Sequence, residues 1–391
     1  MKIAKTTHPL LTAATRRLPD TIALIRRMVE HESPSFNKDA VDGLGRKLAD
    51  ELRQRGATVK VHPAKKFGDH LQADWPGAQS PKPGARSPKP ILLLGHFDTV
   101  YEMGTLASMP WRESGGRLQG PGVLDMKTGI AQMLAAIDLL RETRGALPRP
   151  VRVLLVTDEE VGSESSRAVI ERLAKQSAAV LVCEASYGPQ GHLKTARKGV
   201  GNFTVRVTGV SAHAGLDPEK GQSAIVELAH QITRIAAFSD PKRGLTVNPG
   251  VIRGGTRTNV VAENAECEID VRISKRADEA VIDKKFRSLK PVNWRCRLEV
   301  TGGINRPPME RTKEIAALFA KARQIGAELG MKFGEVSVGG GSDGNLTAAL
   351  GVPTLDGLGA VGDGAHARHE YVVIDEIPKR VALLARLIET I

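Results

Sequence analysis

The sequence predicts an α/β protein in which a mostly parallel, mixed sheet flanked by helices carries a smaller inserted domain. Three observations predict this architecture. The 391 residues exceed what one typical core needs, so two domains are expected. Over residues 91–183, short apolar runs alternate with longer segments of helical periodicity, which is typical of a parallel sheet covered on both faces. From Gly199 the pattern changes to strict apolar and polar alternation, which is typical of strands with one solvent-facing side.

The first region contains three expected strands separated by two helices. Their order is strand, helix, strand, helix, strand, at residues 91–94, 126–144, 151–156, 164–175 and 179–183. The preceding tract SPKPGARSPKP, at 80–90, is rich in proline and basic residues. This composition predicts a solvated loop between two strands.

The next region contains six expected elements in the order β-α-β-β-α-β. Phe203, Val205 and Val207 alternate in the first strand, and the other elements are expected at 221–237, 246–253, 265–273, 277–289 and 297–301. This order predicts a ferredoxin-like, split βαβ domain. The α/β pattern resumes at Arg306, with helices expected at 312–329 and 377–391. We therefore expect a discontinuous main domain, residues 1–198 and 306–391, with residues 199–305 as the insertion.

The formal net charge of +12 raises the question of nucleic-acid binding. Lysine and arginine are spread along the whole chain, however, and aromatic residues make up only 4% of it, with no stacking motif among the basic residues. We therefore expect no nucleic-acid partner. The positive charge is interpreted as attraction for small anionic substrates.

Cysteine content and hydropathy indicate the cellular compartment in which the protein is expected. Cys183, Cys267 and Cys296 are odd in number and far apart, which indicates buried apolar side chains rather than disulfides or a thiolate metal site. Residues 1–17 lack the apolar core of a signal peptide, and no uncharged apolar run approaches the ~20 residues that a bilayer requires. We expect a cytoplasmic protein that does not enter a membrane.

A histidine and an aspartate follow the first strand of the alternating region. The tract LLLGHFDT places His96 and Asp98 two residues apart at the carboxyl end of a buried strand, where they share a face. Open α/β sheets bind ligands at that end. Imidazole binds zinc well, and a nearby carboxylate can hold its other nitrogen. The pair predicts a metal ligand with its orienting neighbour, and a strand-end polar pair without a metal is the alternative.

Acids and histidines recur at other strand ends. Asp125 lies in the glycine-rich turn GPGVLDMKTG before a helix, where helix capping is the alternative role. The three acids at 158–160 follow the strand VRVLLVT and repel one another unless a cation, hydrogen bonds or solvent compensates. Glu184 ends the strand AAVLVC, and the tail GDGAHARHEY contains His366 and His369. Repeated placement of oxygen and nitrogen ligands at strand ends predicts a metal centre.

These motifs resemble those of the zinc-dependent exopeptidases and deacylases, which include carboxypeptidase G, acetylornithine deacetylase, succinyl-diaminopimelate desuccinylase and aminoacylase. GHFDTV, GPGVLDMKTG, TDEEVGS and HARHEYV are similar to four family motifs, in the family's order and over nearly the whole chain. GVSAHAG and GGGSDGN resemble its lid-domain histidine motif and its substrate loop, and are most similar to the carboxypeptidase G branch. The family spacing of histidine and glutamate favours His366, four residues before Glu370, over His369. The inserted domain is similar to the family's lid and dimerisation domain, which implies a homodimer.

The resemblance implies two zinc ions per subunit. Asp125 would bridge them, with His96 and Glu184 completing one site and Glu160 and His366 completing the other. Three carboxylates offset most of the charge of two divalent ions. Mixed nitrogen and oxygen ligands suit zinc, with Co²⁺ or Mn²⁺ as substitutes.

The resemblance also implies the chemistry. A hydroxide that bridges the metals would attack the amide, with Glu159 as general base and then general acid, and Asp98 would support the site. His213 would reach the oxyanion from the partner subunit, and a plain loop histidine is the alternative. A cis peptide bond is expected between Asp125 and Met126.

Substrate recognition is implied in the same way. In the carboxypeptidase G branch an asparagine and an arginine bind the terminal carboxylate of the substrate, and Asn259 and Arg272 occupy the matching motifs. A planar guanidinium binds a carboxylate bidentately, although a surface arginine is the alternative for Arg272. Gly341 and Ser342, in GGGSDGN, would offer backbone amides to the substrate.

The implied function is a dizinc hydrolase that cleaves an amide bond next to a free carboxylate, as a glutamate carboxypeptidase does. Deacylation of an N-acyl amino acid uses the same metals and base and remains the alternative, because only the pocket differs. A non-catalytic binding protein would lack Glu159 or a ligand, and none is missing. A nucleotide-binding oxidoreductase is excluded because no G-x-G-x-x-G opens a helix after the first strand.

Overall fold

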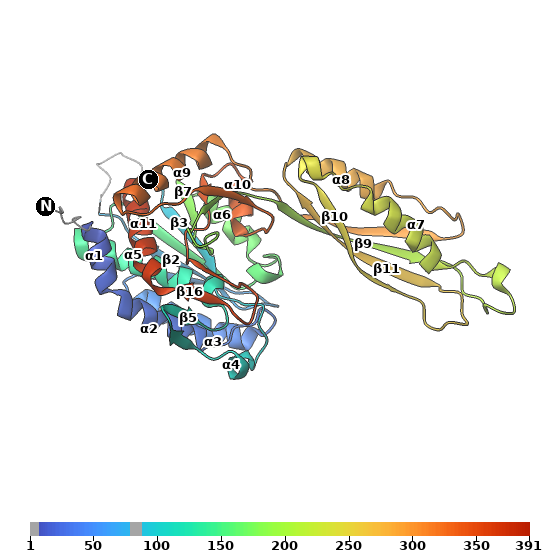
Figure 1. Cartoon of the computed structure of the whole chain (residues 1–391), viewed down its shortest axis with the longest axis horizontal. Helices are drawn as coiled ribbons and strands as arrows, with labels where there is room; N and C mark the ends of the chain where they lie inside the picture. Colours follow the sequence, from blue (N-terminus) through green and yellow to red (C-terminus); the bar gives the residue numbers. More distant parts are fainter. Residues whose placement is uncertain (1–7, 79–87) are drawn as a thin grey trace. The chain divides into compact units, whose positions relative to one another are not determined.

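The computed structural model describes residues 8–78 and 88–391 (Figure 1). The chain separates into two compact units. The main unit comprises the residues up to 196 with 311–337 and 342–391, and the inserted unit comprises 197–310 with 338–341. Of the tract predicted as a loop at 80–90, residues 80–87 lie outside the described part.

The main unit is built on a mixed six-stranded sheet. In spatial order its strands are β1 (Thr58–His62), β2 (His70–Trp75), β6 (Val151–Val156), β3 (Ile91–His96), β7 (Ala179–Val182) and β14 (Thr354–Leu355). The last four are mutually parallel, whereas β2 pairs antiparallel with both β6 and the edge strand β1. The prediction of a mostly parallel, mixed sheet is confirmed.

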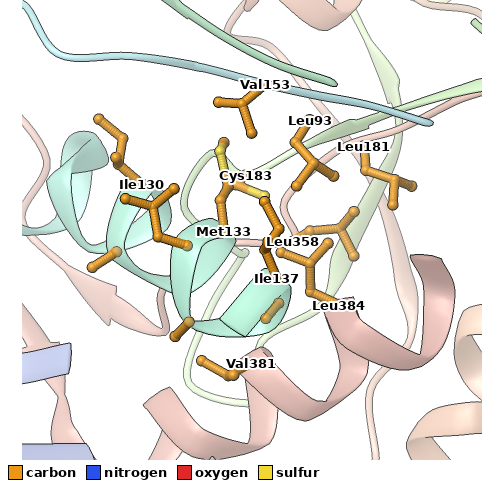
Figure 2. Close-up of a cluster of buried hydrophobic side chains, with 14 of the residues drawn as sticks. Leu93, Ile130, Met133, Ile137, Val153, Leu181, Cys183, Leu358, Val381 and Leu384 are labelled. Atoms are coloured by element: carbon orange, nitrogen blue, oxygen red, sulfur yellow. The ribbon is translucent and has the colours of Figure 1, made fainter. Parts of the chain in front are cut away.

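Helices cover both faces of this sheet because alternate strand residues point to opposite sides. Leu93, Val153 and Leu181 belong to the larger hydrophobic cluster, together with residues of α1 (Pro9–Arg16), α2 (Leu18–Val29), α3 (Lys38–Gln54), α5 (Thr128–Arg144), α9 (Lys313–Glu328) and α11 (Ile377–Thr390). Figure 2 shows side chains of α5 and α11 gathered around these strand residues. Leu94 and Leu154 point to the other face and pack with α6 (Arg167–Lys175) and α10 (Asp343–Ala348).

A small antiparallel sheet joins two distant segments of the main unit. Its strands lie in the order β15 (Gly362–Asp363), β16 (Tyr371–Val373), β5 (Arg117–Gln119) and β4 (Arg112–Ser114). Because Tyr371 pairs with both Gln119 and Asp363, the tail GDGAHARHEY lies beside the segment that leads into the turn GPGVLDMKTG. The short helix α4 (Thr105–Ser108) and the paired strands β8 (Leu193–Arg197) and β13 (Glu335–Val338) are further regular elements of the chain.

The inserted unit has the predicted β-α-β-β-α-β order. Its elements are β9 (Gly199–Thr208), α7 (Ala224–Ala236), β10 (Thr246–Gly254), β11 (Asn264–Ile273), α8 (Ala277–Arg287) and β12 (Arg297–Arg306). The sheet is antiparallel throughout, in the order β10-β11-β9-β12, which is the ferredoxin-like arrangement. Phe203 of β9 stacks on Phe286 of α8 with ring centroids 3.9 Å apart, so the alternating apolar residues form the core between sheet and helices.

Some elements begin later than the pattern indicated. Helix α5 begins at Thr128 rather than 126, because 123–127 form a wider turn with non-helical dihedral angles at Asp125 and Met126. Before residue 91 the pattern predicted only the strand that precedes the loop at 80–90, and the described residues of that region form three helices and two strands. The three cysteines are buried and free, as predicted. Within the described ranges, no helix is both long and apolar enough to span a bilayer.

Candidate metal centre

The carboxyl end of β3 orients His96. Its buried ring places Nδ1 3.1 Å from the backbone oxygen of Asp98 and 3.4 Å from Asp98 Oδ1. A hydrogen bond from Nδ1 to either oxygen leaves Nε2 facing the carboxylates of Asp125 and Glu184, at 3.2 and 3.4 Å. This is how a metal-binding histidine is oriented by its neighbours.

Asp98 connects β3 to the acidic turn that follows β6. Its Oδ2 accepts hydrogen bonds from Ser35 Oγ at 2.7 Å and from the backbone nitrogen of Glu160 at 3.3 Å, and its Oδ1 accepts from the backbone nitrogen of Glu159 at 3.4 Å. These contacts fix the backbone from which the two glutamates project. The carboxylate of Glu159 lies with the ligand atoms of His96 and Glu184, all within 4.8 Å of one another. The carboxylate of Glu160 faces a different side chain, that of His366.

Asp125 lies between two histidines. Its Oδ1 is 3.2 Å from His96 Nε2, and its Oδ2 is 3.3 Å from His366 Nε2. Glu160 Oε2 lies 3.2 Å from the same nitrogen of His366. The structure thus brings all five predicted ligands together as two groups that share Asp125, with Glu184 in the first group and Glu160 in the second.

The pKa shifts of the clustered side chains indicate that this site favours positive charge. Hydrogen bonds with Asp125 and Glu160 raise the pKa of His366 to about 10. Burial lowers the pKa of His96, but hydrogen bonds with the surrounding carboxylates outweigh it and bring this pKa well above its usual value. Burial raises the pKa of Asp125, yet the two histidines hold it below its usual range, and burial raises the pKa of Glu160. The clustered carboxylates therefore favour positive charge beside them, and divalent cations would supply it.

The turn that carries Asp125 is pressed against β7. The peptide bond between Asp125 and Met126 is cis, as expected. At Gly129, in the first turn of α5, an added Cβ would lie 2.1 Å from the backbone oxygen of Cys183. Glycine therefore permits the close approach that brings Asp125 beside Glu184, the residue after Cys183.

The tail turn between β15 and β16 presents His366. Its backbone has φ of 64°, a conformation that non-glycine residues seldom adopt, and its side chain is 51% exposed. His369 is exposed, whereas His366 Nε2 lies 3.3 Å from Asp125 Oδ2 and 3.2 Å from Glu160 Oε2. The prediction that His366 rather than His369 faces the other ligands agrees with these positions.

One buried carboxylate was missed by the sequence analysis as a site residue. Glu370 Oε1 accepts hydrogen bonds from the backbone nitrogens of Leu124 at 2.7 Å and Asp125 at 3.0 Å. Its Oε2 accepts from the backbone nitrogen of Gly122 at 3.0 Å and from the Tyr101 hydroxyl at 2.7 Å. The signal in the sequence was the fixed spacing from His366, which was used only to choose between two histidines.

Four residues with predicted catalytic or substrate-binding roles lie in the inserted unit: His213, Asn259, Arg272 and Gly341. His213 is exposed, and its Nδ1 accepts hydrogen bonds from the backbone nitrogens of Gly215 and Leu216, both at 3.1 Å. Because backbone N–H groups can only donate, the neutral ring carries its proton on Nε2. Asn259 is also exposed. It lies close to His213, because its backbone oxygen accepts a hydrogen bond from the backbone nitrogen of Ala214 at 3.0 Å.

Arg272 and the glycine-rich loop already have partners within the protein. Arg272 Nε and Nη2 donate to Asp270 at 2.8 to 3.1 Å, and Nη1 lies 3.5 Å from the backbone oxygen of Gly339. Ser342 is buried as the N-cap of α10, where its Oγ accepts from Gly344 and donates to Asp356 at 2.6 Å. The backbone oxygen of Gly341 accepts from Arg197 Nη1 at 3.2 Å. The substrate roles of Asn259, Arg272, Gly341 and Ser342 stay predictions.

An α/β unit with acids and histidines gathered at its strand ends, interrupted by a ferredoxin-like unit, defines a metallohydrolase of the peptidase type. The chain belongs to Peptidase family M20/M25/M40, whose pattern matches residues 92–390. The predicted resemblance is therefore confirmed at the level of the family.

Known relatives agree with this assignment. The chain is 31% identical to carboxypeptidase G2 of Pseudomonas sp. (strain RS-16) over 395 aligned residues, which cover 98% of this chain and 92% of that protein. Its fold is similar to aminopeptidase PepT from Bacillus cereus, with a TM-score of 0.76 at 21% identity, covering 95% of this chain and 98% of that one. It is also similar to the Bacillus subtilis YXEP protein, described as a dinuclear metal-binding peptidase, with a TM-score of 0.69 at 18% identity and coverage of 96% and 100%.

Proposed function

We propose that this metallopeptidase is a carboxypeptidase G-like enzyme that cleaves an amide bond next to a free carboxylate, using two zinc ions. The observation that carries the proposal is the position of Asp125, which presents one oxygen to each of two histidine–glutamate pairs. The similarity to carboxypeptidase G2 over nearly the whole chain supports the choice of bond.

The residues present fit two divalent cations. His96 and Glu184 would hold one ion, Glu160 and His366 would hold the other, and Asp125 would bind both. The donor set contains nitrogen and carboxylate oxygen without thiolate, which suits zinc and also accommodates Co²⁺ or Mn²⁺. When bound, the ions polarise the scissile carbonyl and lower the pKa of water enough for attack at neutral pH.

Glu159 is the proposed proton carrier. Its side chain is buried beside His96 and Glu184, and its backbone is held by Asp98. Its carboxylate removes a proton from the attacking water and returns it to the leaving nitrogen, so the base of the first step becomes the acid of the second. Glu160 has a separate role because it faces His366.

The inserted unit is proposed to bind the substrate. Arg272 is preoriented by Asp270 and retains donors for the carboxylate of a small substrate or short peptide, and Asn259 would add an amide. His213, with its proton on Nε2, would donate to the developing oxyanion. Gly341 and Ser342 complete the proposed substrate contacts.

We also propose that two copies associate through the inserted unit, with His213 acting on the substrate of the partner subunit. Strand β10 is an edge of its sheet and exposes Val251 and Ile252, and helix α7 exposes Ile225 and Val226. An exposed apolar edge strand is a surface suited to pairing with a second copy. Sedimentation analysis of the wild type and of Ile252→Lys tests this, since a monomeric wild type contradicts it.

The experiment that tests the function is release of free amino acid from C-terminal glutamate peptides and from acetylated and succinylated amino acids. The protein is stripped with chelator and reloaded with zinc, with Glu159→Ala as the inactive variant and Glu164→Ala, an exposed acid in the same loop, as the matched control. Zinc-dependent turnover of glutamyl peptides by the wild type and the control supports the proposal. Turnover limited to acylated amino acids assigns the deacylase alternative, and zinc binding without turnover assigns a binding protein.

A further inference from the structure

Glu370 forms a saturated hydrogen-bonding anchor. A carboxylate has about four acceptor positions, and in Glu370 three are used by backbone N–H groups of the 122–125 turn and the fourth by the Tyr101 hydroxyl. Its side chain is fully buried. Loss of a buried acceptor leaves its donors unsatisfied, so this arrangement restrains the turn strongly.

The same anchor reaches the second histidine. Glu370 belongs to the tail turn that carries His366, and the Tyr101 hydroxyl also lies 3.0 Å from the backbone oxygen of Ala367, the next residue. One of its bonds goes to the backbone nitrogen of Asp125. Glu370 and Tyr101 therefore join the tail turn to the turn of the shared ligand, although Glu370 is in neither ligand group of the described residues.

We propose that Glu370 is a positioning residue, which sets the metal affinity of the centre by holding Asp125 and His366 at the correct separation. This inference rests on the proposed metal function. Asp125 Oδ2 and His366 Nε2, from the two turns, lie 3.3 Å apart, so a shift of either turn would change the geometry of the centre. Partners that orient metal ligands typically contribute about 10- to 100-fold to metal affinity or activity.

The variant Glu370→Gln tests the role because it keeps the size of the side chain. Its single oxygen can accept two hydrogen bonds, but its NH₂ group can only donate and opposes the remaining donors. Zinc affinity is measured by competition with a chromophoric chelator, which needs no turnover. We expect E370Q to bind zinc about 10- to 100-fold more weakly. We also expect kcat to recover at saturating zinc with KM unchanged.

Glu227 of the inserted unit offers a matched control. It is a buried carboxylate that accepts hydrogen bonds from the backbone nitrogens of Val292 at 2.9 Å and Asn293 at 2.8 Å. Glu227→Gln removes the same kind of anchor away from the ligand turns. We expect it to lower the melting temperature and to leave zinc affinity unchanged.

Zinc affinity of E370Q within about twofold of the wild type overturns the inference, since a typical orienting partner contributes more. A low kcat at saturating zinc with unchanged zinc affinity also overturns the inference, because this result assigns Glu370 a direct part in the chemistry. If E370Q does not fold, Tyr101→Phe removes one bond of the four, and we expect a several-fold loss of zinc affinity, with wild-type affinity overturning the inference. A wild-type protein that binds no zinc overturns the proposed function as well, which separates the two failures.

Discussion

Oδ2 of Asp125 lies 3.3 Å from Nε2 of His366, while the other oxygen of the same carboxylate faces His96 at 3.2 Å. Asp125 thus presents one carboxylate oxygen to a histidine of each candidate site. We predict that Asp125→Ala loses both metal ions, whereas His366→Ala loses one and retains the other. Metal content after gel filtration, measured by plasma mass spectrometry, checks this.

The control for this prediction is His369→Ala. His369 is exposed in the same turn, three residues from His366, and should retain the wild-type metal content. If Asp125→Ala and His366→Ala lost equal amounts of metal, the assignment of Asp125 as the shared ligand would be wrong.

Substitutions of the adjacent residues Glu159 and Glu160 should distinguish metal binding from proton transfer. Glu159→Gln should keep the bound metals and lose about 10²- to 10⁴-fold in kcat, because a general base contributes rates of this size. Glu160→Gln should lose metal, since its carboxylate faces His366. Metal content and kcat are measured for both variants. Loss of metal from Glu159→Gln would instead make Glu159 a ligand.

Arg272 should bind the free carboxylate of the substrate. Arg272→Ala removes a charged donor, worth ~1.5 to 3 kcal/mol, so kcat/KM should fall roughly 10- to 100-fold for substrates with a free carboxylate. Carboxyl-amidated analogues should be cleaved equally by the variant and the wild type. Arg253→Ala, another strand arginine paired with acids of the inserted unit, is the matched control and should match the wild type.

The positions of most site residues followed from the sequence because the strands that carry them are continuous apolar runs. His96 and Glu184 directly end or follow such strands, and the carboxyl ends of neighbouring parallel strands meet at one edge. The end of such a strand can be located from a short stretch of the sequence. This is why the fold of the main unit and the placement of His96 and Glu184 could be predicted together. Asp125 and His366 lie in turns, and their roles were implied by the resemblance to the family.

Contacts between distant turns could not be read in this way. Glu370 reaches the backbone nitrogens of Gly122 and Leu124, and backbone nitrogens have no residue identity to reveal the contact. Ser342 illustrates the same limit, because its hydroxyl is used as a helix cap only once α10 and Asp356 are in place. Strands β1 and β2 carry polar residues, and β1 is the edge of the sheet, so no apolar run located them in the sequence.

His70 should make folding stability depend on pH. Burial lowers its pKa below the usual 6.5, and its nitrogens lie 2.9 Å from Thr157 Oγ1 and 3.1 Å from Ser165 Oγ. The unfolded chain therefore binds a proton near pH 6.5 that the folded protein does not. This contribution is present above about pH 6.5 and is lost as the pH falls from there toward the lower folded pKa, by up to ~1.4 kcal/mol per pH unit.

Urea unfolding of metal-free protein between about pH 5 and 8 measures this dependence, because histidine changes its charge in this range. Histidines of the metal centre have raised pKa values and contribute with the opposite sign, so the comparison is between the wild type and His70→Asn. The variant should lose less stability on acidification. Parallel curves for the two proteins would refute the assignment to His70.

Two helix glycines should respond in opposite ways to alanine. At Gly129 the new Cβ would meet the backbone oxygen of Cys183 at 2.1 Å, and neither α5 nor β7 can move without disturbing Asp125 and Glu184. At Gly45 in α3 the nearest atom is Phe97 Cζ at 3.4 Å, an ordinary contact. We expect Gly129→Ala to cost ~1 to 3 kcal/mol of unfolding free energy through overpacking. Gly45→Ala should be neutral or stabilising by up to ~1 kcal/mol through helix propensity. Denaturant unfolding of the metal-free variants measures both changes, and equal effects would show that the close approach at Gly129 is not what restricts this position.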